Sequence, residues 1–107
     1  MSRVVVTLIG SAKFKNYFSW VEEQLILEGY IVLTPTIFRS CKQYEKMTKR
    51  EKAMYRCIHR EKIKMSDEVK VVNFMGYIDD DTRTEIDYAI RHGIKVTYLE
   101  WGVCYVK

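Results

Sequence analysis

The feature that most constrains the fold is a run of six residues, Val4 to Ile9, in which only Thr7 is polar. The run stops at Gly10 and Ser11. A short, nearly continuous apolar segment that ends at a turn signal is typical of a β-strand buried on both faces. A strand of this kind needs helices above and below it, so the run favours a parallel sheet in an α/β fold.

The rest of the chain alternates helical and strand signatures. The further predicted strands are the short β-prone segments 30–33, 69–74 and 94–99. The predicted helices are 14–27, which stops at Glu28-Gly29; 48–65, which opens on the capping box Thr48 to Glu51; and part of 76–93, which stops at His92-Gly93. Strands that alternate with helices in this way form parallel sheets through right-handed crossovers.

We therefore expect a single domain over residues 1–107 with an α/β fold: a three-layer, Rossmann-like or flavodoxin-like parallel sheet of four to five strands with flanking helices. The tail 100–107 would supply either the fifth strand or an interface element. In open sheets of this class, ligands bind beyond the carboxyl ends of the strands, near the point where the strand order reverses. The segments predicted at that edge are 10–13, 34–36, 73–81 and the start of the third helix.

Composition excludes several classes of protein. No apolar run approaches the roughly 20 residues that span a bilayer, and the N-terminus shows no signal-peptide pattern, so we expect a cytoplasmic protein without membrane contact. The three cysteines, Cys41, Cys57 and Cys104, lack CxxC spacing and are interpreted as free thiols rather than metal ligands. Neither a GxGxxG nor a P-loop pattern is present. We therefore predict no cofactor and no metal.

The net charge of +4 is concentrated in one segment. The segment from Lys42 to Lys64 contains nine Lys or Arg residues and three glutamates, so its net charge is +6. A basic helix can attract nucleic acid or a phosphorylated ligand, although a charge run is more often a solvated helix face. All three interpretations stay open at this point.

An acidic segment opens the third predicted helix. Asp80 or Asp81 is expected to cap the helix, with the neighbouring carboxylates stabilised by the positive helix end. Capping does not account for Glu85, three residues beyond Thr82. If Glu85 points to the strand-end cleft, it can act as a nucleophile toward an acetal-like carbon, splitting glycosidic cleavage into two displacement steps. The alternative is a solvent-facing glutamate, or a partner of a nearby arginine.

Three stretches carry a resemblance to a known family: VVTLIGS (5–11), MSDEVKVVN (65–73) and DTRTEIDYAIRHGIKV (81–96). Together they resemble nucleoside 2-deoxyribosyltransferase-like proteins over almost the whole chain. The resemblance implies a nucleoside or nucleoside monophosphate substrate, Glu85 as the nucleophile, and Gly10 and Ser11 beside the sugar or its 5′ end. Active members carry a tyrosine where this chain has Thr7 or Leu8, and an aspartate where it has His59 or Arg60. A histidine can act as a general acid near neutral pH.

The predicted site residues follow from these arguments. The predicted catalytic residues are Glu85 and His59. The predicted substrate-binding residues are Gly10, Ser11, Lys13, Asn73, Gly76, Asp81 and Thr82.

Three functions remain open. The first is hydrolysis or transfer at the N-glycosidic bond of a nucleoside or nucleoside monophosphate. The second is binding of a nucleotide-derived ligand without turnover, which the differences at Thr7 and His59 permit. The third is an interaction protein whose basic helix meets nucleic acid or an acidic partner. Self-association into a homo-oligomer is also expected, from the aromatic residues Tyr44, Tyr55 and Trp101.

Overall fold

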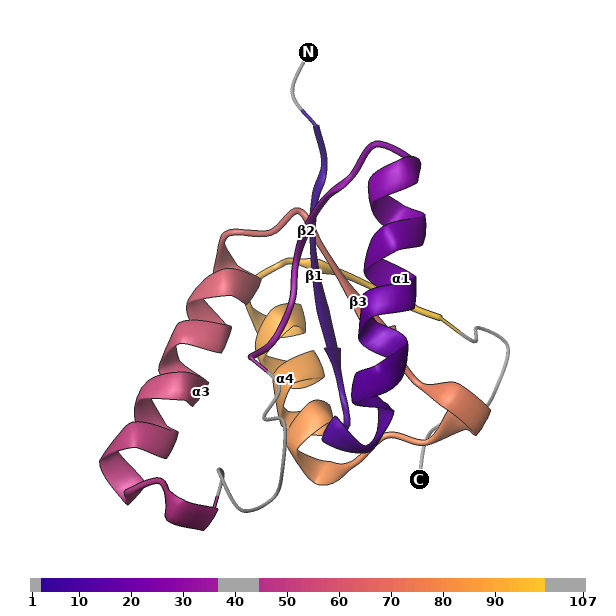
Figure 1. Ribbon diagram of the computed structural model, residues 1–107. Coiled ribbons are helices and arrows are strands. Elements are labelled where there is room, and N and C mark those ends of the chain that lie inside the picture. The colour runs from indigo at the N-terminus through magenta and orange to yellow at the C-terminus, as the bar shows by residue number, and fades with distance from the viewer. Residues whose placement is uncertain (1–2, 37–44, 100–107) are drawn as a thin grey trace.

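The structure is a computed structural model that describes residues 3–36 and 45–99 (Figure 1). Its strands are β1 (Val5–Gly10), β2 (Ile31–Leu33), β3 (Glu68–Val72) and β4 (Lys95–Tyr98). Its helices are α1 (Lys15–Leu27), α3 (Lys49–Lys64) and α4 (Asp80–Arg91), with two short 3₁₀ helices, η1 (Ala12–Phe14) and η2 (Phe74–Gly76). All these strands and α-helices were predicted from the sequence. The ends of the strands and of α1 and α3 agree within two residues, and α4 lies within the predicted segment 76–93.

The four strands form one parallel sheet in the order β2-β1-β3-β4. Strand β1 lies between β2 and β3, and the side chains of its residues 6–9 are completely buried. This confirms the prediction of a strand covered on both faces and of a parallel α/β fold. The fifth strand considered for the tail 100–107 falls outside the described residues.

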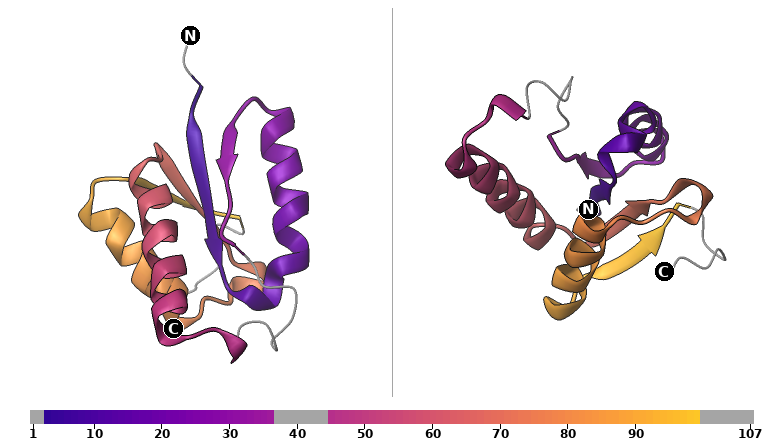
Figure 2. Two further views of the ribbon diagram at one scale, coloured as in Figure 1. Left: turned by 60° about the vertical axis from the view of Figure 1, so that its left-hand side comes forward. Right: turned by 90° about the horizontal axis from the view of Figure 1, so that it is seen from below.

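Helices cover both faces of the sheet, which gives three layers. Helix α1 lies on one face, and α3 and α4 lie on the other (Figure 2). Side chains alternate along β1, so Val6 and Leu8 pack toward α1 while Ile9 packs toward α3 and α4. The core on the α1 face consists of Val6, Leu8, Phe14, Phe18, Val21, Leu25 and Val72. The core on the other face consists of Ile9, Ile63, Val69, Val71 and Ala89.

The helices begin and end at the signals in the sequence. Thr48 and Glu51 form the predicted capping box of α3, in which each side chain accepts a hydrogen bond from the other residue's amide. Gly29 follows α1 and Gly93 follows α4, both with positive φ. Local chemistry therefore accounts for the start of α3 and for the ends of α1 and α4.

The order of the strands determines where a ligand can bind. From β1 the chain moves through α1 to β2 on one side, and it later returns to β3 on the other side of β1. The carboxyl ends of β1 and β3 are thus the point of reversal, where α/β sheets hold their ligands.

Within the described ranges, no helix combines the length and the apolar character needed to cross a lipid bilayer.

Candidate active site

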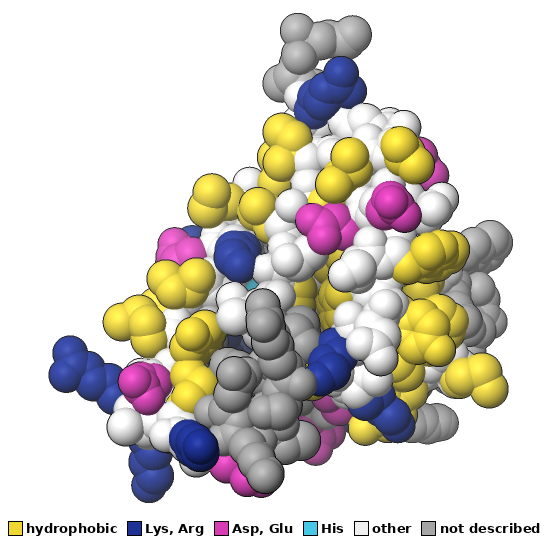
Figure 3. Space-filling view, viewed as in Figure 1, with side chains coloured by type: hydrophobic (Ala, Val, Ile, Leu, Met, Phe, Trp, Pro, Cys, Tyr) yellow, Lys and Arg dark blue, Asp and Glu magenta, His cyan; other side chains and the backbone are white. Residues whose placement is uncertain are grey.

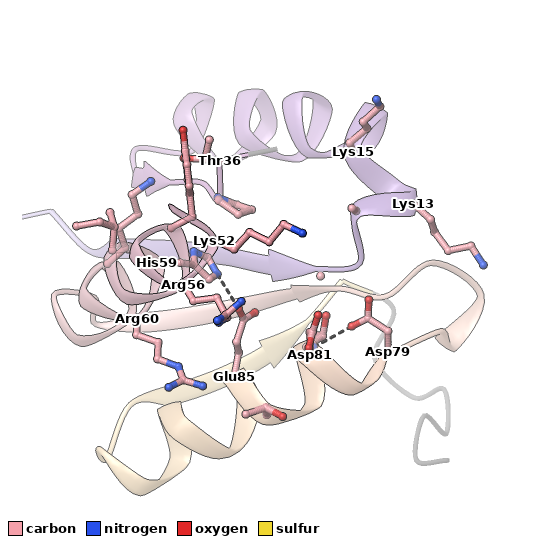
Figure 4. Close-up of a pocket in the computed structure, with 18 of the residues that line it drawn as sticks. Lys13, Lys15, Thr36, Lys52, Arg56, His59, Arg60, Asp79, Asp81 and Glu85 are labelled. Atoms are coloured by element: carbon pink, nitrogen blue, oxygen red, sulfur yellow. Dashed lines mark hydrogen bonds and ion pairs between the residues drawn. The ribbon is translucent and has the colours of Figure 1, made fainter. Parts of the chain in front are cut away.

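A cleft of about 970 Å³ opens at the carboxyl end of β1, between α3 and the start of α4 (Figure 4). The segment after β1 contributes Gly10, Ala12, Lys13, Lys15 and Asn16, and the segment after β2 contributes Pro35 and Thr36. Its wall on α3 is formed by Lys52, Tyr55, Arg56, Ile58, His59, Arg60 and Lys62. Its wall on α4 and the preceding residue is formed by Asp79, Asp81, Thr82, Thr84 and Glu85. The predicted location of the site, at the strand ends, agrees with this cleft.

Glu85 and His59 meet inside the cleft. Glu85 Oε2 lies 3.4 Å from His59 Nε2, and the side chains are only 21% and 10% exposed. The contact joins α4 to α3, two helices that are separated by β3 in the sequence. His59 Nδ1 is buried and has no hydrogen-bond partner among the described residues. Among the described residues, the polar contact given for the imidazole is therefore the one between Nε2 and Glu85.

The residue at which α4 begins determines where Glu85 lies along the wall of the cleft. Asp79, rather than Asp80 or Asp81, caps the helix: its Oδ1 accepts a hydrogen bond from the Thr82 amide at 2.8 Å. The prediction that Asp80 or Asp81 caps was wrong, because the helix begins at Asp80, one or two residues earlier than that assignment required. Asp80 and Asp81 instead occupy the first turn, where the helix dipole favours a negative charge.

In the turn that follows β1, polar groups form hydrogen bonds with one another. Ser11 is buried, its Oγ accepts from the Lys13 amide at 3.2 Å, and its carbonyl accepts from the Phe14 amide at 2.9 Å. Gly10 lines the cleft, but a Cβ there would lie 2.8 Å from the Val72 carbonyl oxygen. The close approach that requires glycine is therefore to β3.

Lys13 is at the far end of the cleft from Glu85. Its side chain points outward in Figure 4, and its Nζ lies 4.0 Å from the centre of the Tyr77 ring. This cation–π contact holds the ammonium group outside the cleft, on the aromatic side of the molecule. Lys13 still contributes to the rim of the cleft.

The other predicted substrate-binding residues divide into two groups. Asp81 and Thr82 line the cleft. Asn73 is completely buried at the end of β3, and neither it nor Gly76 is among the lining residues. Their amide and carbonyl groups instead form the η2 turn, in which the Gly76 amide donates to the Asn73 carbonyl at 2.8 Å. The structure therefore brings Gly10, His59, Asp81, Thr82 and Glu85 together around one cavity.

The sequence indicated a basic helix that could attract a phosphorylated ligand, but it did not single out the cations of α3 that face the cleft. Lys52 and Arg56 point into the cleft, toward the region occupied by His59 and Glu85 (Figure 4). Their spacing of four residues, with His59 three residues further on, places them on one face of the helix. That spacing was visible in the sequence, but the direction in which the face points was not.

Charge is divided across the cleft. Six Lys or Arg residues and four carboxylates line it, with the cations mainly on α3 and the carboxylates mainly at the start of α4. Lys and Arg side chains also gather over the N-terminal part of α3 on the face shown in Figure 3. Five of the six cleft cations interact with other groups. Lys13 contacts the Tyr77 ring, Arg60 contacts the Tyr88 ring, and Lys62 donates to the Thr34 carbonyl. Lys15 and Lys52 each make an interaction as well.

The remaining predictions concern metal sites, thiols and aromatic residues. Residues 3–36 and 45–99 contain no group of three or more His, Cys, Asp or Glu residues that could hold a metal ion. Cys57 is an exposed free thiol, whereas Cys41 and Cys104 lie outside the described residues. Tyr44 and Trp101 also lie outside them, and Tyr55 lines the cleft.

One solved structure with a similar fold is described as a 2-desoxiribosyltransferase from Leishmania mexicana. The two share 16% sequence identity with a TM-score of 0.66, over 89% of this chain and 63% of that chain. This chain thus corresponds to less than two thirds of the length of that structure. The likeness confirms, at the level of the fold, the resemblance predicted from the sequence motifs.

Sequence comparison gives a family. Among curated proteins, none matches this chain. A family model described as a domain of unknown function, DUF4406, matches residues 6–98, which include almost all of β1 and extend to the last residue of β4. Because the match covers most of the chain and both walls of the cleft, the chain belongs to the DUF4406 family.

Proposed function

We propose that the chain cleaves the N-glycosidic bond of a nucleoside or a nucleoside monophosphate, with Glu85 as the nucleophile. The observation that carries the proposal is the position of Glu85: a half-buried carboxylate, on a capped helix, 3.4 Å from an imidazole in a cleft at the strand ends. The likeness of fold to a 2-desoxiribosyltransferase supports the same class of reaction.

The reaction follows from the chemistry of a carboxylate next to an imidazole. A Glu85 oxygen attacks the anomeric carbon, the carbon–nitrogen bond to the base breaks, and its electron pair passes to the base nitrogen. A covalent glycosyl ester of Glu85 results. His59 supplies a proton to the departing base, a task that suits an imidazole near neutral pH. Attack on the ester by water then gives hydrolysis, and attack by a second base gives transfer.

The cleft also suits the sugar. Asp81 and Thr84 line it on the α4 side, next to Glu85, and a carboxylate and a hydroxyl can hydrogen-bond to sugar hydroxyl groups. The half-burial of Glu85 strengthens its electrostatic interactions relative to those in bulk water. Helix α4 holds the carboxylate on a rigid element, which favours a reproducible attack geometry.

The test is release of free base from a panel of ribonucleosides, deoxyribonucleosides and their monophosphates. We expect Glu85→Gln to lower the rate roughly 10⁴-fold or more, because loss of a covalent nucleophile removes the reaction path. His59→Gln should lower it roughly 10²-fold or more, as loss of a general acid does. Asp87→Asn is the matched control, since Asp87 lies on the same helix but is exposed and paired with Arg91. Base release that is equal in the wild type and Glu85→Gln would show that the proposed reaction is wrong.

Binding without turnover is a second candidate function, and Thr7 favours it. The Thr7 hydroxyl is buried, donates to the Lys62 carbonyl at 3.1 Å and contacts the Ser66 hydroxyl, so it faces α3 rather than the cleft. Strand β1 thus contributes only Gly10 to the cleft. Under this alternative, the same compounds would raise the melting temperature without any base release, because a ligand at a concentration of 100 Kd adds about 2.7 kcal/mol to the free energy of unfolding.

A further inference from the structure

The basic face of α3 is turned toward the cleft rather than only toward solvent. Lys52, Arg56, His59 and Arg60 all line the cavity, and Ile63, one turn further on, is completely buried in the core. Helix α3 therefore packs on the sheet through its C-terminal half, while the same face of its N-terminal half borders the cleft. Cations that line a concave surface raise the local concentration of anionic ligands.

Arg56 is the cation of this wall that most needs a ligand. Among residues 3–36 and 45–99, it has no ion pair, hydrogen bond or ring contact with another side chain. Arg60, which lies one helical turn after Arg56, stacks on the Tyr88 ring, and Lys62 donates to the Thr34 carbonyl. A guanidinium group can bind a phosphate through two parallel hydrogen bonds.

The opposite end of the cleft does not suit an anion. At the first turn, the amides of Lys13 and Phe14 are already bonded to Ser11. The carboxylates of Asp79 and Asp81 line the adjacent wall, and like charges repel. An anionic group is therefore favoured on the α3 side and disfavoured at the turn that follows β1.

We infer that Arg56 and Lys52 form a phosphate subsite, so that the ligand of the cleft is a phosphorylated nucleoside rather than a free nucleoside. The identity of the sugar and base rests on the proposed function, whereas the phosphate subsite rests on the cations of α3. Along the helix axis, Arg56 is about 4.5 Å and Lys52 about 10.5 Å from His59, at 1.5 Å per residue. A phosphate bound there lies close enough for its sugar to reach Glu85, which contacts His59.

The subsite is tested by binding measurements that do not depend on turnover. Isothermal titration calorimetry with the Glu85→Gln protein compares nucleosides, their 5′-monophosphates and inorganic phosphate. We expect the monophosphates to bind roughly 10- to 100-fold more tightly than the nucleosides, as one or two charge-assisted hydrogen bonds imply. Arg56→Gln and Lys52→Gln should each remove most of this preference, because they should weaken binding of the monophosphates far more than binding of the nucleosides.

Arg50→Gln is the matched control, because Arg50 lies on the same helix, is exposed and does not line the cleft. The inference is overturned if nucleosides and monophosphates bind equally, or if Arg50→Gln weakens monophosphate binding as much as Arg56→Gln does. It is also overturned if a single-stranded oligonucleotide binds more tightly than the monophosphates and its binding depends on Arg50 and Lys49, because this face of the helix would then bind nucleic acid.

Free nucleosides that are cleaved without any phosphate preference would refute the subsite alone. Phosphate-selective binding without base release from the wild type would refute the proposed reaction alone.

Discussion

The cap of α4 allows a quantitative test, because three adjacent aspartates have different roles. Asp79 accepts a hydrogen bond from the Thr82 amide at 2.8 Å, whereas Asp80 is an exposed residue of the first turn. Replacing Asp79 with Ala removes both the cap and a negative charge at the positive end of the helix. Replacing Asp79 with Asn keeps a capping oxygen and removes only the charge.

The expected magnitudes differ enough to be separated. Loss of an N-cap side chain costs about 1 kcal/mol, and loss of a charge near the helix dipole costs about 0.3–1 kcal/mol more. Asp79→Ala should therefore lower the free energy of unfolding by roughly 1–2 kcal/mol. Asp79→Asn should lower it by only the charge contribution. Asp80→Ala loses the same charge contribution but gains helix propensity, so its net effect should be within about 0.5 kcal/mol of zero.

The assay is urea unfolding followed by far-ultraviolet circular dichroism, with the slope m compared among variants. A loss of 1 kcal/mol in a domain of about this size lowers the Tm by roughly 4–8 °C, which gives an independent measurement. The reasoning is refuted if Asp80→Ala is as destabilising as Asp79→Ala, or if Asp79→Asn costs as much as Asp79→Ala.

Further predictions concern the core and the glycines. Ile63→Ala should cost about 2–5 kcal/mol because Ile63 is completely buried, whereas Ile58→Ala on the same helix, 48% exposed, should cost less than about 0.5 kcal/mol in the same urea assay. Gly10→Ala should cost about 1–3 kcal/mol from overpacking, because its Cβ would lie 2.8 Å from the Val72 carbonyl oxygen. Gly93→Ala has open space around the added Cβ and should lose only about 1 kcal/mol from its positive φ. A smaller loss for Gly10→Ala than for Gly93→Ala would contradict the account of Gly10.

Much of the fold was predictable because its signals are local. The apolar run that became β1, the capping box of α3 and the glycines after α1 and α4 each determine a structure within a few residues of themselves. Parallel pairing then follows from the alternation of strand and helix, because right-handed crossovers leave few other arrangements. The assignment of the α4 cap failed by one or two residues, since three consecutive aspartates offer nearly equivalent capping groups and the sequence does not rank them.

The candidate site was predicted less completely, because its parts come from distant segments. The sequence indicated Glu85 as a carboxylate that capping does not explain, and it indicated His59 only through a family resemblance. It could not show that the two side chains lie 3.4 Å apart, which depends on how α3 and α4 pack side by side on one face of the sheet.

The sequence by itself determined the elements of this protein, their order and most of their ends, because hydrophobic periodicity and capping depend on residues that are close together in the chain. Only the tertiary structure decided which side chains share the cleft. Lys52 and Arg56 read in the sequence as part of a charged helix, and the packing of Ile63 into the core is what turns their face toward Glu85. That direction is a property of the packed helix as a whole, so no local pattern could have determined it.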